Sequence, residues 1–299
     1  MNGPPVSMPD DVTSEPSGPG SRVRVARDEV WVDGLRLGTT TVTPTGEHDS
    51  SPIIVTLGIL AKLDTFEEQR FWLLADRLRR PVIALDTPGW TVRGGGLPHQ
   101  VRRRLRRGGF DWLAHLLGDV VLRTNPGVLD LAPSVVGYSL GASTGSALAA
   151  DLTARGADLR GLSLIEPVAV RRQSLVELAW RNLRDARHSH RYAVENKDLA
   201  WAVSSGSRLP WPRAIELSLL VWAISRGHIP ETVAGLPAKI PVTLVSGERS
   251  TLAPLPAIDR LAIGLRRSGH PVDQHTIPDA HHALWNSLAV VDRIADWIV

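Results

Sequence analysis

Ser139 is the residue whose surroundings most clearly indicate chemistry. It is the centre of a Gly-Tyr-Ser-Leu-Gly motif at 137–141, between an apolar run at 134–137 and a segment of small residues at 142–154 that is expected to be helical. Glycines two before and two after a serine allow a sharp strand-to-helix turn that lifts the hydroxyl above the backbone. The free N–H groups at the start of such a helix can stabilise an oxyanion. The motif therefore predicts a nucleophilic serine, and a glycine-rich turn without chemistry is the alternative.

A serine nucleophile needs a base, because an unassisted hydroxyl is a poor nucleophile at neutral pH. Histidine, with a pKa of about 6.5, suits this role. His281 and His282 follow a strand-like segment near the C-terminus. Without the serine motif, this pair would be interpreted as the cap of a surface helix.

The elements that must position these groups alternate along the chain. Helical periodicity at 65–79 and 110–122 separates short apolar runs that read as strands. Asp33-Gly34 is a hairpin signal. Alternation of this kind predicts a mostly parallel sheet with helices on both faces. Ligands then bind at the carboxyl ends of the strands, where Ser139, Glu166 and His282 are expected to converge. Strands are predicted at 23–26, 29–32, 35–43, 53–57, 81–86, 134–137, 162–166, 241–247 and near 276. In the helix predicted at 65–79, the residues expected to face the sheet are Phe66, Trp72, Leu73, Leu74 and Leu78.

Over roughly residues 30–299 the chain resembles the α/β-hydrolase family. The resemblance rests on the serine motif, on Asp86-Thr87-Pro88-Gly89, which is similar to a D-x-P-G loop of the family, and on the chain order of serine, acid and histidine. It implies an α/β fold with a mostly parallel, doubly wound sheet and an inserted helical cap. The core would comprise 22–166 and 241–299, and the cap or lid would comprise 167–240.

The resemblance also implies roles for individual residues. Ser139 would be the nucleophile, and the backbone N–H groups of Ile59 and Leu140 would form the oxyanion hole. His282 would be the base, with His281 in place of the usual glycine. Leu57 occupies a position where many members have histidine, a departure that leaves the backbone donors intact.

The acid is the second departure from the family pattern. The usual aspartate after the penultimate strand is replaced by Ser250, and serine cannot stabilise an imidazolium as a carboxylate does. Glu166, at the end of the preceding strand, is the expected replacement, because some members of the family carry their acid there. Glu248, Asp279, another carboxylate and the absence of any acid remain alternatives.

The region 167–240 is helix-like and rich in tryptophan and arginine. The tryptophans either line an apolar pocket above Ser139 or pack the core of the cap itself. We expect Trp90, Tyr138 and Trp180 to line the substrate pocket. The cap tryptophans are Trp180, Trp201, Trp211 and Trp222.

The expected function is that of a serine hydrolase with a Ser-His-Glu triad, which cleaves an ester, thioester or related acyl bond of a mainly apolar small molecule. The alternative is a non-catalytic protein of the same fold that senses a ligand or binds a protein. No cofactor and no metal are expected.

Composition limits the remaining possibilities. The chain has 299 residues, 43% of them hydrophobic, no cysteine and a net charge of +3. No apolar run is long enough to span a membrane, and the Pro/Gly/Ser-rich residues 1–21 read as a disordered tail, unlike a signal peptide. We expect a cytoplasmic monomer or homodimer that binds no nucleic acid. The arginine cluster Arg102–Arg107 either holds an anion or is a solvated face, and the solvated face is preferred.

Overall fold

The computed structural model describes residues 22–299 except 60, 88–95, 197–198, 200 and 203–213. The predicted tail at 1–21, Trp90, Trp211 and the Pro-Gly of the D-x-P-G loop lie outside the described residues. Within the described part, no helix combines the length and apolar character needed to cross a membrane.

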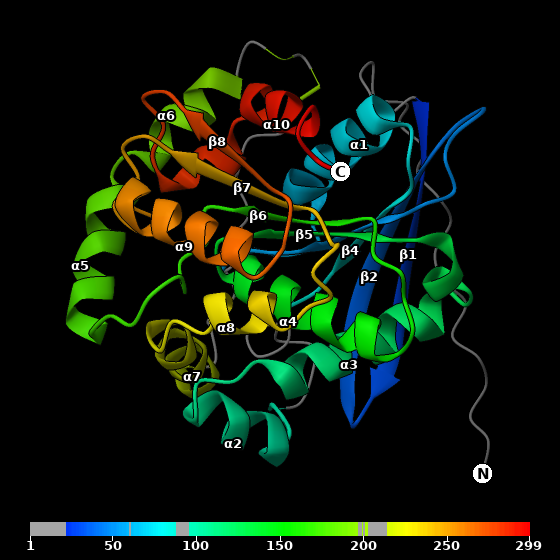
Figure 1. Ribbon diagram of the computed structural model, residues 1–299. Helices are drawn as coiled ribbons and strands as arrows, with labels where there is room; N and C mark the ends of the chain where they lie inside the picture. Colours follow the sequence, from blue (N-terminus) through cyan, green and yellow to red (C-terminus); the bar gives the residue numbers. More distant parts are fainter. Residues whose placement is uncertain (1–21, 60, 88–95, 197–198, 200, 203–213) are drawn as a thin grey trace.

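A single eight-stranded sheet forms the centre of the molecule (Figure 1), in the order β1-β2-β4-β3-β5-β6-β7-β8. β2 is antiparallel to both β1 and β4, and all other neighbours are parallel. The predicted mostly parallel sheet is thus confirmed. The strands are β1 (Val23–Val32), β2 (Leu35–Pro44), β3 (Ile53–Thr56), β4 (Val82–Leu85), β5 (Ser134–Tyr138), β6 (Gly161–Ile165), β7 (Val242–Gly247) and β8 (Val272–Ile277).

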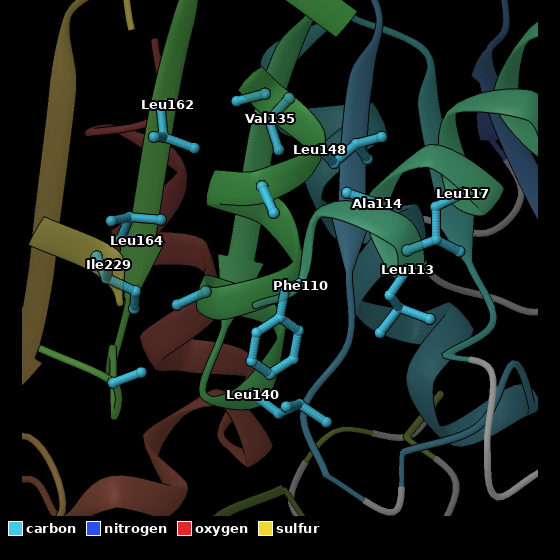
Figure 2. Packing of buried hydrophobic residues seen from close by; sticks show 14 of the residues in the cluster. Phe110, Leu113, Ala114, Leu117, Val135, Leu140, Leu148, Leu162, Leu164 and Ile229 are labelled. Atoms are coloured by element: carbon cyan, nitrogen blue, oxygen red, sulfur yellow. The ribbon is translucent and has the colours of Figure 1, made fainter. Parts of the chain in front are cut away.

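Helices cover both faces of the sheet, as strands that are apolar on both sides require. Successive residues of β5 show the two faces, because Val135 belongs to one hydrophobic cluster and Val136 to the other. Figure 2 shows part of the first cluster, in which residues of β5 and β6 pack against helices on that face of the sheet. That face carries α3 (Asp111–Thr124), α4 (Leu140–Ala154), α8 (Ile229–Ala234) and α9 (Leu255–Arg267), and the other carries α1 (Thr65–Leu78) and α10 (Leu288–Ala295).

Two predicted elements differ from the structure. Residues 23–26 and 29–32 form one continuous strand, β1, because the polar Arg27 between them pairs with Glu68 of α1 and need not leave the sheet. In α1, Trp72 and Leu74 are buried as predicted, but Phe66, Leu73 and Leu78 are only half-buried. The sheet-facing side is centred on Phe71, Leu74 and Ala75, so the predicted face is rotated from the observed one.

Between β6 and β7, in the region predicted to be the cap, the described residues form four helices. They are α5 (Leu175–Ala186), α6 (Ser189–Glu195), α7 (Ala214–Ser225) and α8. α5 contacts α7, and α6 contacts η4 (His282–Asn286), the short helix that follows β8. α8 packs against the core helices α4 and α9. α7 also contacts α2 (His99–Arg106), the helix that contains most of the arginine cluster.

Candidate active site

Ser139 lies in a strained turn between β5 and α4. Its φ of 57° and ψ of −114° are conformations that a non-glycine residue rarely adopts, and such strain is typical of functional turns. The two flanking glycines make the turn possible, because they let neighbouring backbone segments approach closely. A Cβ on Gly137 would lie 2.3 Å from the carbonyl oxygen of Gly141, and a Cβ on Gly141 would lie 2.0 Å from that of Thr56. Any larger residue at either position would therefore displace backbone.

Ser139, His282 and Glu166 form a continuous chain of hydrogen bonds. Ser139 Oγ lies 2.8 Å from His282 Nε2, and His282 Nδ1 lies 2.7 Å from Glu166 Oε2. All three residues are buried, with exposed fractions of 6%, 9% and 0%. An Nδ1–H that donates to the carboxylate leaves Nε2 free to accept the serine proton, which is the tautomer that a general base needs.

The Glu166 carboxylate is held by two more donors. Glu166 ends β6 with a φ of 52°, in the left-handed region. The N–H of Gly247 donates to Oε1, and the Ser250 hydroxyl donates to Oε2 at 2.5 Å. Ser250, at the position where the resemblance led us to expect an aspartate, thus contacts the expected acid Glu166. Sequence reasoning named Ser250 only as a departure and missed this contact.

The two alternative carboxylates lie elsewhere. Glu248 Oε2 accepts from the N–H of Asp279 at 2.9 Å, and the Asp279 carboxylate pairs with Arg249. Both acids are exposed at the surface. Neither forms a hydrogen bond with His282 in the described part of the chain, in contrast to Glu166.

His281 points away from Ser139. Its Nδ1 lies 3.3 Å from Asp185 Oδ1, and its ring stacks on His188 with centroids 3.7 Å apart. Asp185, on α5, also accepts from the N–H and hydroxyl of Thr251 at 2.8 and 2.7 Å and from the N–H of Leu252 at 3.1 Å. His281 therefore joins the catalytic turn to the helices after β6, while His282 contacts the serine.

A buried arginine fixes the turn that carries His282. Arg70 of α1 is fully buried and donates to the carbonyl oxygens of Phe66, Trp285 and Asn286, the last two at 2.7 and 3.2 Å. Sequence reasoning missed this residue. The available signal was a charged side chain four residues after Phe66 and four before Leu74, on the apolar side of the helix.

Tyr138 supports the same turn from the strand side. Its hydroxyl donates to the carbonyl oxygen of His282 at 3.0 Å, and its ring stacks on those of His282 and Trp285. Burial, with a further contribution from the Glu166 charge, holds the Tyr138 pKa well above its usual range, so this hydroxyl stays a donor.

Backbone N–H groups face the same space. Leu140 is the first residue of α4, so its N–H has no partner within the helix. The backbone before Ile59 lies against the turn, since a Cβ on Gly58 would be 3.5 Å from Ser139 Cβ. Among the described residues, neither the Ile59 nor the Leu140 N–H donates a hydrogen bond. Both are available to an oxygen bound beside Ser139.

A cavity of about 780 Å³ opens on Ser139. Ile59, Tyr138, Leu140 and His282 line its base. Much of the remaining lining is apolar and comes from α5, α7 and the segments after β6 and β7, although α5 also contributes Asn182 and Asp185. Polar residues gather near α1 and η4. The apolar wall comprises Val168, Leu178, Val221, Ile224 and Leu252, and the polar side comprises Lys62, Asp64, Glu67 and Asn286.

The prediction that Trp180 lines this cavity is wrong. The α5 residues that line it are Leu178, Asn182 and Asp185 with their neighbours, a spacing of four and three that marks one helix face. Trp180 lies on the opposite face, is 58% exposed and has Arg184 over its ring. Trp222 donates to the carbonyl oxygen of Arg106 at 2.8 Å, and it does not line the cavity either.

No protein-family model and no curated protein matches the sequence. Solved structures do match the fold. A thioesterase domain from the curacin biosynthetic pathway aligns at a TM-score of 0.59 and 16% identity over 91% of this chain and 99% of its own. A lipase in an open form aligns at a TM-score of 0.59 and 18% identity, over 91% of this chain and 100% of the lipase chain. A thermostable esterase from Pseudomonas putida aligns at a TM-score of 0.57 and 13% identity, over 93% of this chain and 81% of the esterase chain. At these identities the similarity establishes the fold.

Proposed function

We propose, from the premise that the chain has the α/β-hydrolase fold, that it is a serine hydrolase. Its substrate is an ester, thioester or related acyl compound with a mainly apolar acyl part. The observation that carries this proposal is the chain of two hydrogen bonds from Ser139 through His282 to Glu166, at the base of a cavity with an apolar wall. The similar thioesterase, lipase and esterase are consistent with it.

The first half of the reaction forms an acyl-enzyme. Ser139 Oγ attacks the carbonyl carbon of the substrate while His282 Nε2 takes the hydroxyl proton. The N–H groups of Ile59 and Leu140 stabilise the negative oxygen of the tetrahedral intermediate. The intermediate then breaks its bond to the alcohol or thiol, which leaves with the proton from His282. Glu166 keeps the imidazole oriented and stabilises its positive charge.

The second half releases the acid. Water gives a proton to His282 and attacks the acyl carbon, and collapse of the new intermediate returns the proton to Ser139 Oγ. The region 167–240 acts in this proposal as a cap, because Leu178, Val221 and Ile224 supply much of the apolar wall. That wall binds the acyl chain and excludes water from it.

A fluorophosphonate probe tests the proposal. Intact-mass analysis should show one adduct per chain, located on Ser139 by peptide mapping. Ser139→Ala should not be labelled and should lose about 10⁶-fold in kcat on a short-chain aryl ester. Ser246→Ala is the matched control, because Ser246 is fully buried and its hydroxyl has no hydrogen-bond partner among the described groups. It should be labelled like the unmodified protein. A folded protein that takes up no probe would favour the non-catalytic alternative.

A further inference from the structure

A second cavity, of about 440 Å³, lies on the other side of α4 from the sheet, away from Ser139. It shares no lining residue with the Ser139 cavity. Its walls come from four places: the loop between α2 and α3 with the first residue of α3, the middle of α4, the segment after β6, and the residues from Arg226 into α8. Arg107, the last residue of the arginine cluster, is part of this wall.

Three arginines surround the cavity without a carboxylate partner. Within the described residues, Arg107, Arg172 and Arg226 form no ion pair. The stem of Arg226 lies against Gly108, and its guanidinium group lies over the ring of Trp222. All three are exposed at the rim. Like charges on three side chains around one cavity repel one another, and an anion bound among them would relieve this repulsion.

The acidic residues of the wall do not remove this positive charge. Asp111 pairs with Arg104 at 3.1 Å, and Asp151 pairs with Arg155 at 2.6 Å. Both carboxylates are thus already compensated by arginines outside the cavity. Glu231 is a third acidic residue of the wall and is exposed at its edge. One carboxylate against three guanidinium groups leaves the cavity positive.

His228 also lines the cavity, and its ring nitrogens are buried. The His228 ring stacks on Phe110 with centroids 4.6 Å apart, and both ring nitrogens are buried without a hydrogen-bond partner. The backbone of Ser143 lies near the ring and partly opposes the effect of burial on the His228 pKa. Burial lowers the His228 pKa to about 4, so the ring is neutral at pH 7. A neutral imidazole has one donor and one acceptor, and leaving them unsatisfied is costly.

The cavity also lies beside two segments of the proposed cap. Arg172 precedes α5, and Arg226 follows α7. The two segments are joined by a hydrogen bond from the N–H of Gln173 to the carbonyl oxygen of Ser225 at 2.9 Å. Arg107 follows α2, which lies beside α7 (Figure 1). A ligand held by all three arginines would therefore connect both cap segments to the core.

We propose that this cavity binds a phosphate group, held by the guanidinium groups of Arg107, Arg172 and Arg226. Guanidinium forks match the geometry of phosphate oxygens and form charge-assisted hydrogen bonds with them. His228 is neutral at pH 7, so it adds no charge of its own to the site. The site is independent of the acyl chemistry at Ser139.

Calorimetric titration of the full chain with inorganic phosphate, at an ionic strength kept constant with sodium chloride, tests the site. We expect saturable binding of one phosphate per chain. Arg172→Gln and Arg226→Gln should each weaken it at least about tenfold, since each removes charge-assisted hydrogen bonds. Arg103→Gln is the matched control, because Arg103 is an exposed arginine of α2 that does not line the cavity. It should bind phosphate like the unmodified protein.

The source of the phosphate group is distinguished by two further titrations. Glycerol 3-phosphate represents a soluble phosphomonoester, and vesicles of phosphatidylcholine with phosphatidic acid represent a lipid headgroup. Binding of either that is lost in Arg226→Gln and kept in Arg103→Gln supports the site and identifies the source. The proposal is overturned if no phosphate compound binds, or if Arg103→Gln weakens binding as much as Arg226→Gln. If a glutamine variant does not fold by circular dichroism, Arg172→Lys should still lose affinity, because lysine lacks the bidentate fork.

Discussion

Glu166→Gln is the substitution that most directly tests how this site works. The side chain keeps its shape, but one carboxylate oxygen becomes an NH₂ group. In the structure both oxygens accept from donors: Oε1 from the N–H of Gly247, and Oε2 from His282 Nδ1 and the Ser250 hydroxyl. The amide must therefore place a donor against a donor in either orientation.

The two orientations have different costs. With the NH₂ group towards Gly247, two buried donors face each other, which costs about 1–3 kcal/mol. With the NH₂ group towards His282, the imidazole must accept at Nδ1 and carry its proton on Nε2, where it cannot take a proton from Ser139. The wrong tautomer lowers kcat by about 10⁴-fold in a well-studied triad. Even in the favourable orientation, the imidazolium loses its counter-charge.

We therefore expect Glu166→Gln to lower kcat at least about 10³-fold, which corresponds to about 4 kcal/mol of transition-state free energy. The melting temperature should fall by only a few degrees. Steady-state hydrolysis of p-nitrophenyl butyrate measures the first value and differential scanning calorimetry the second. Glu248→Gln is the matched control, because its carboxylate binds only the N–H of Asp279 among the described groups, and it should cost less than tenfold. Greater damage from Glu248→Gln, or more than a tenth of the activity left in Glu166→Gln, would refute the assignment.

Three further predictions concern other parts of the molecule. Ser250→Ala removes one donor to Glu166 and should lower kcat by roughly tenfold with KM unchanged, by the typical strength of a hydrogen bond to a charged group; an unchanged kcat would show that the contact is not used. Activity on p-nitrophenyl esters should vary with acyl length from acetate to decanoate, measured as kcat/KM, because the cavity wall is apolar; a flat profile would contradict a selective cavity. The unfolded chain protonates His228 near pH 6.5 and the folded chain only near pH 4, so the free energy of unfolding should fall as pH falls through this range, by about 3 kcal/mol. Urea unfolding at pH 8, 6 and 4.5 measures this loss, and His228→Phe, which keeps a ring against Phe110, should lack that part of it.

The sequence predicts the core of this fold well, because buried strands and amphipathic helices have distinct periods. It also brings Ser139, Glu166 and His282 to one edge of the sheet, since residues after parallel strands must meet there. Side-chain direction is harder to predict. Trp180 was placed in the cavity by its residue type, whereas the helix face that lines the cavity is set by how α5 packs on the core.

The contacts between distant segments could not be predicted from the sequence at all. Arg70 and Ser250 act on residues far away in the chain, through backbone carbonyls in one case and a carboxylate in the other. Neither contact leaves a local pattern, because any residue of the right length and polarity could make it. The cavity that we propose for phosphate could not be predicted either, because Arg107, Arg172 and Arg226 come to line one cavity only through the packing of α2 and α7.

The contacts of Asp185 have a consequence for how a substrate could reach Ser139. This one carboxylate binds Thr251 and Leu252, the residues directly after Ser250, and also His281, the residue directly before His282. Any outward movement of α5 would therefore pull on the two segments that align the acid and the base. In the proposed reaction, the site would be least competent while α5 was displaced, and the reaction would resume only after α5 returned. A substrate that entered past other elements of the cavity wall would leave the triad undisturbed. The position of α5 would then couple a closed cavity to an aligned triad, and α5 itself would not be the lid that opens.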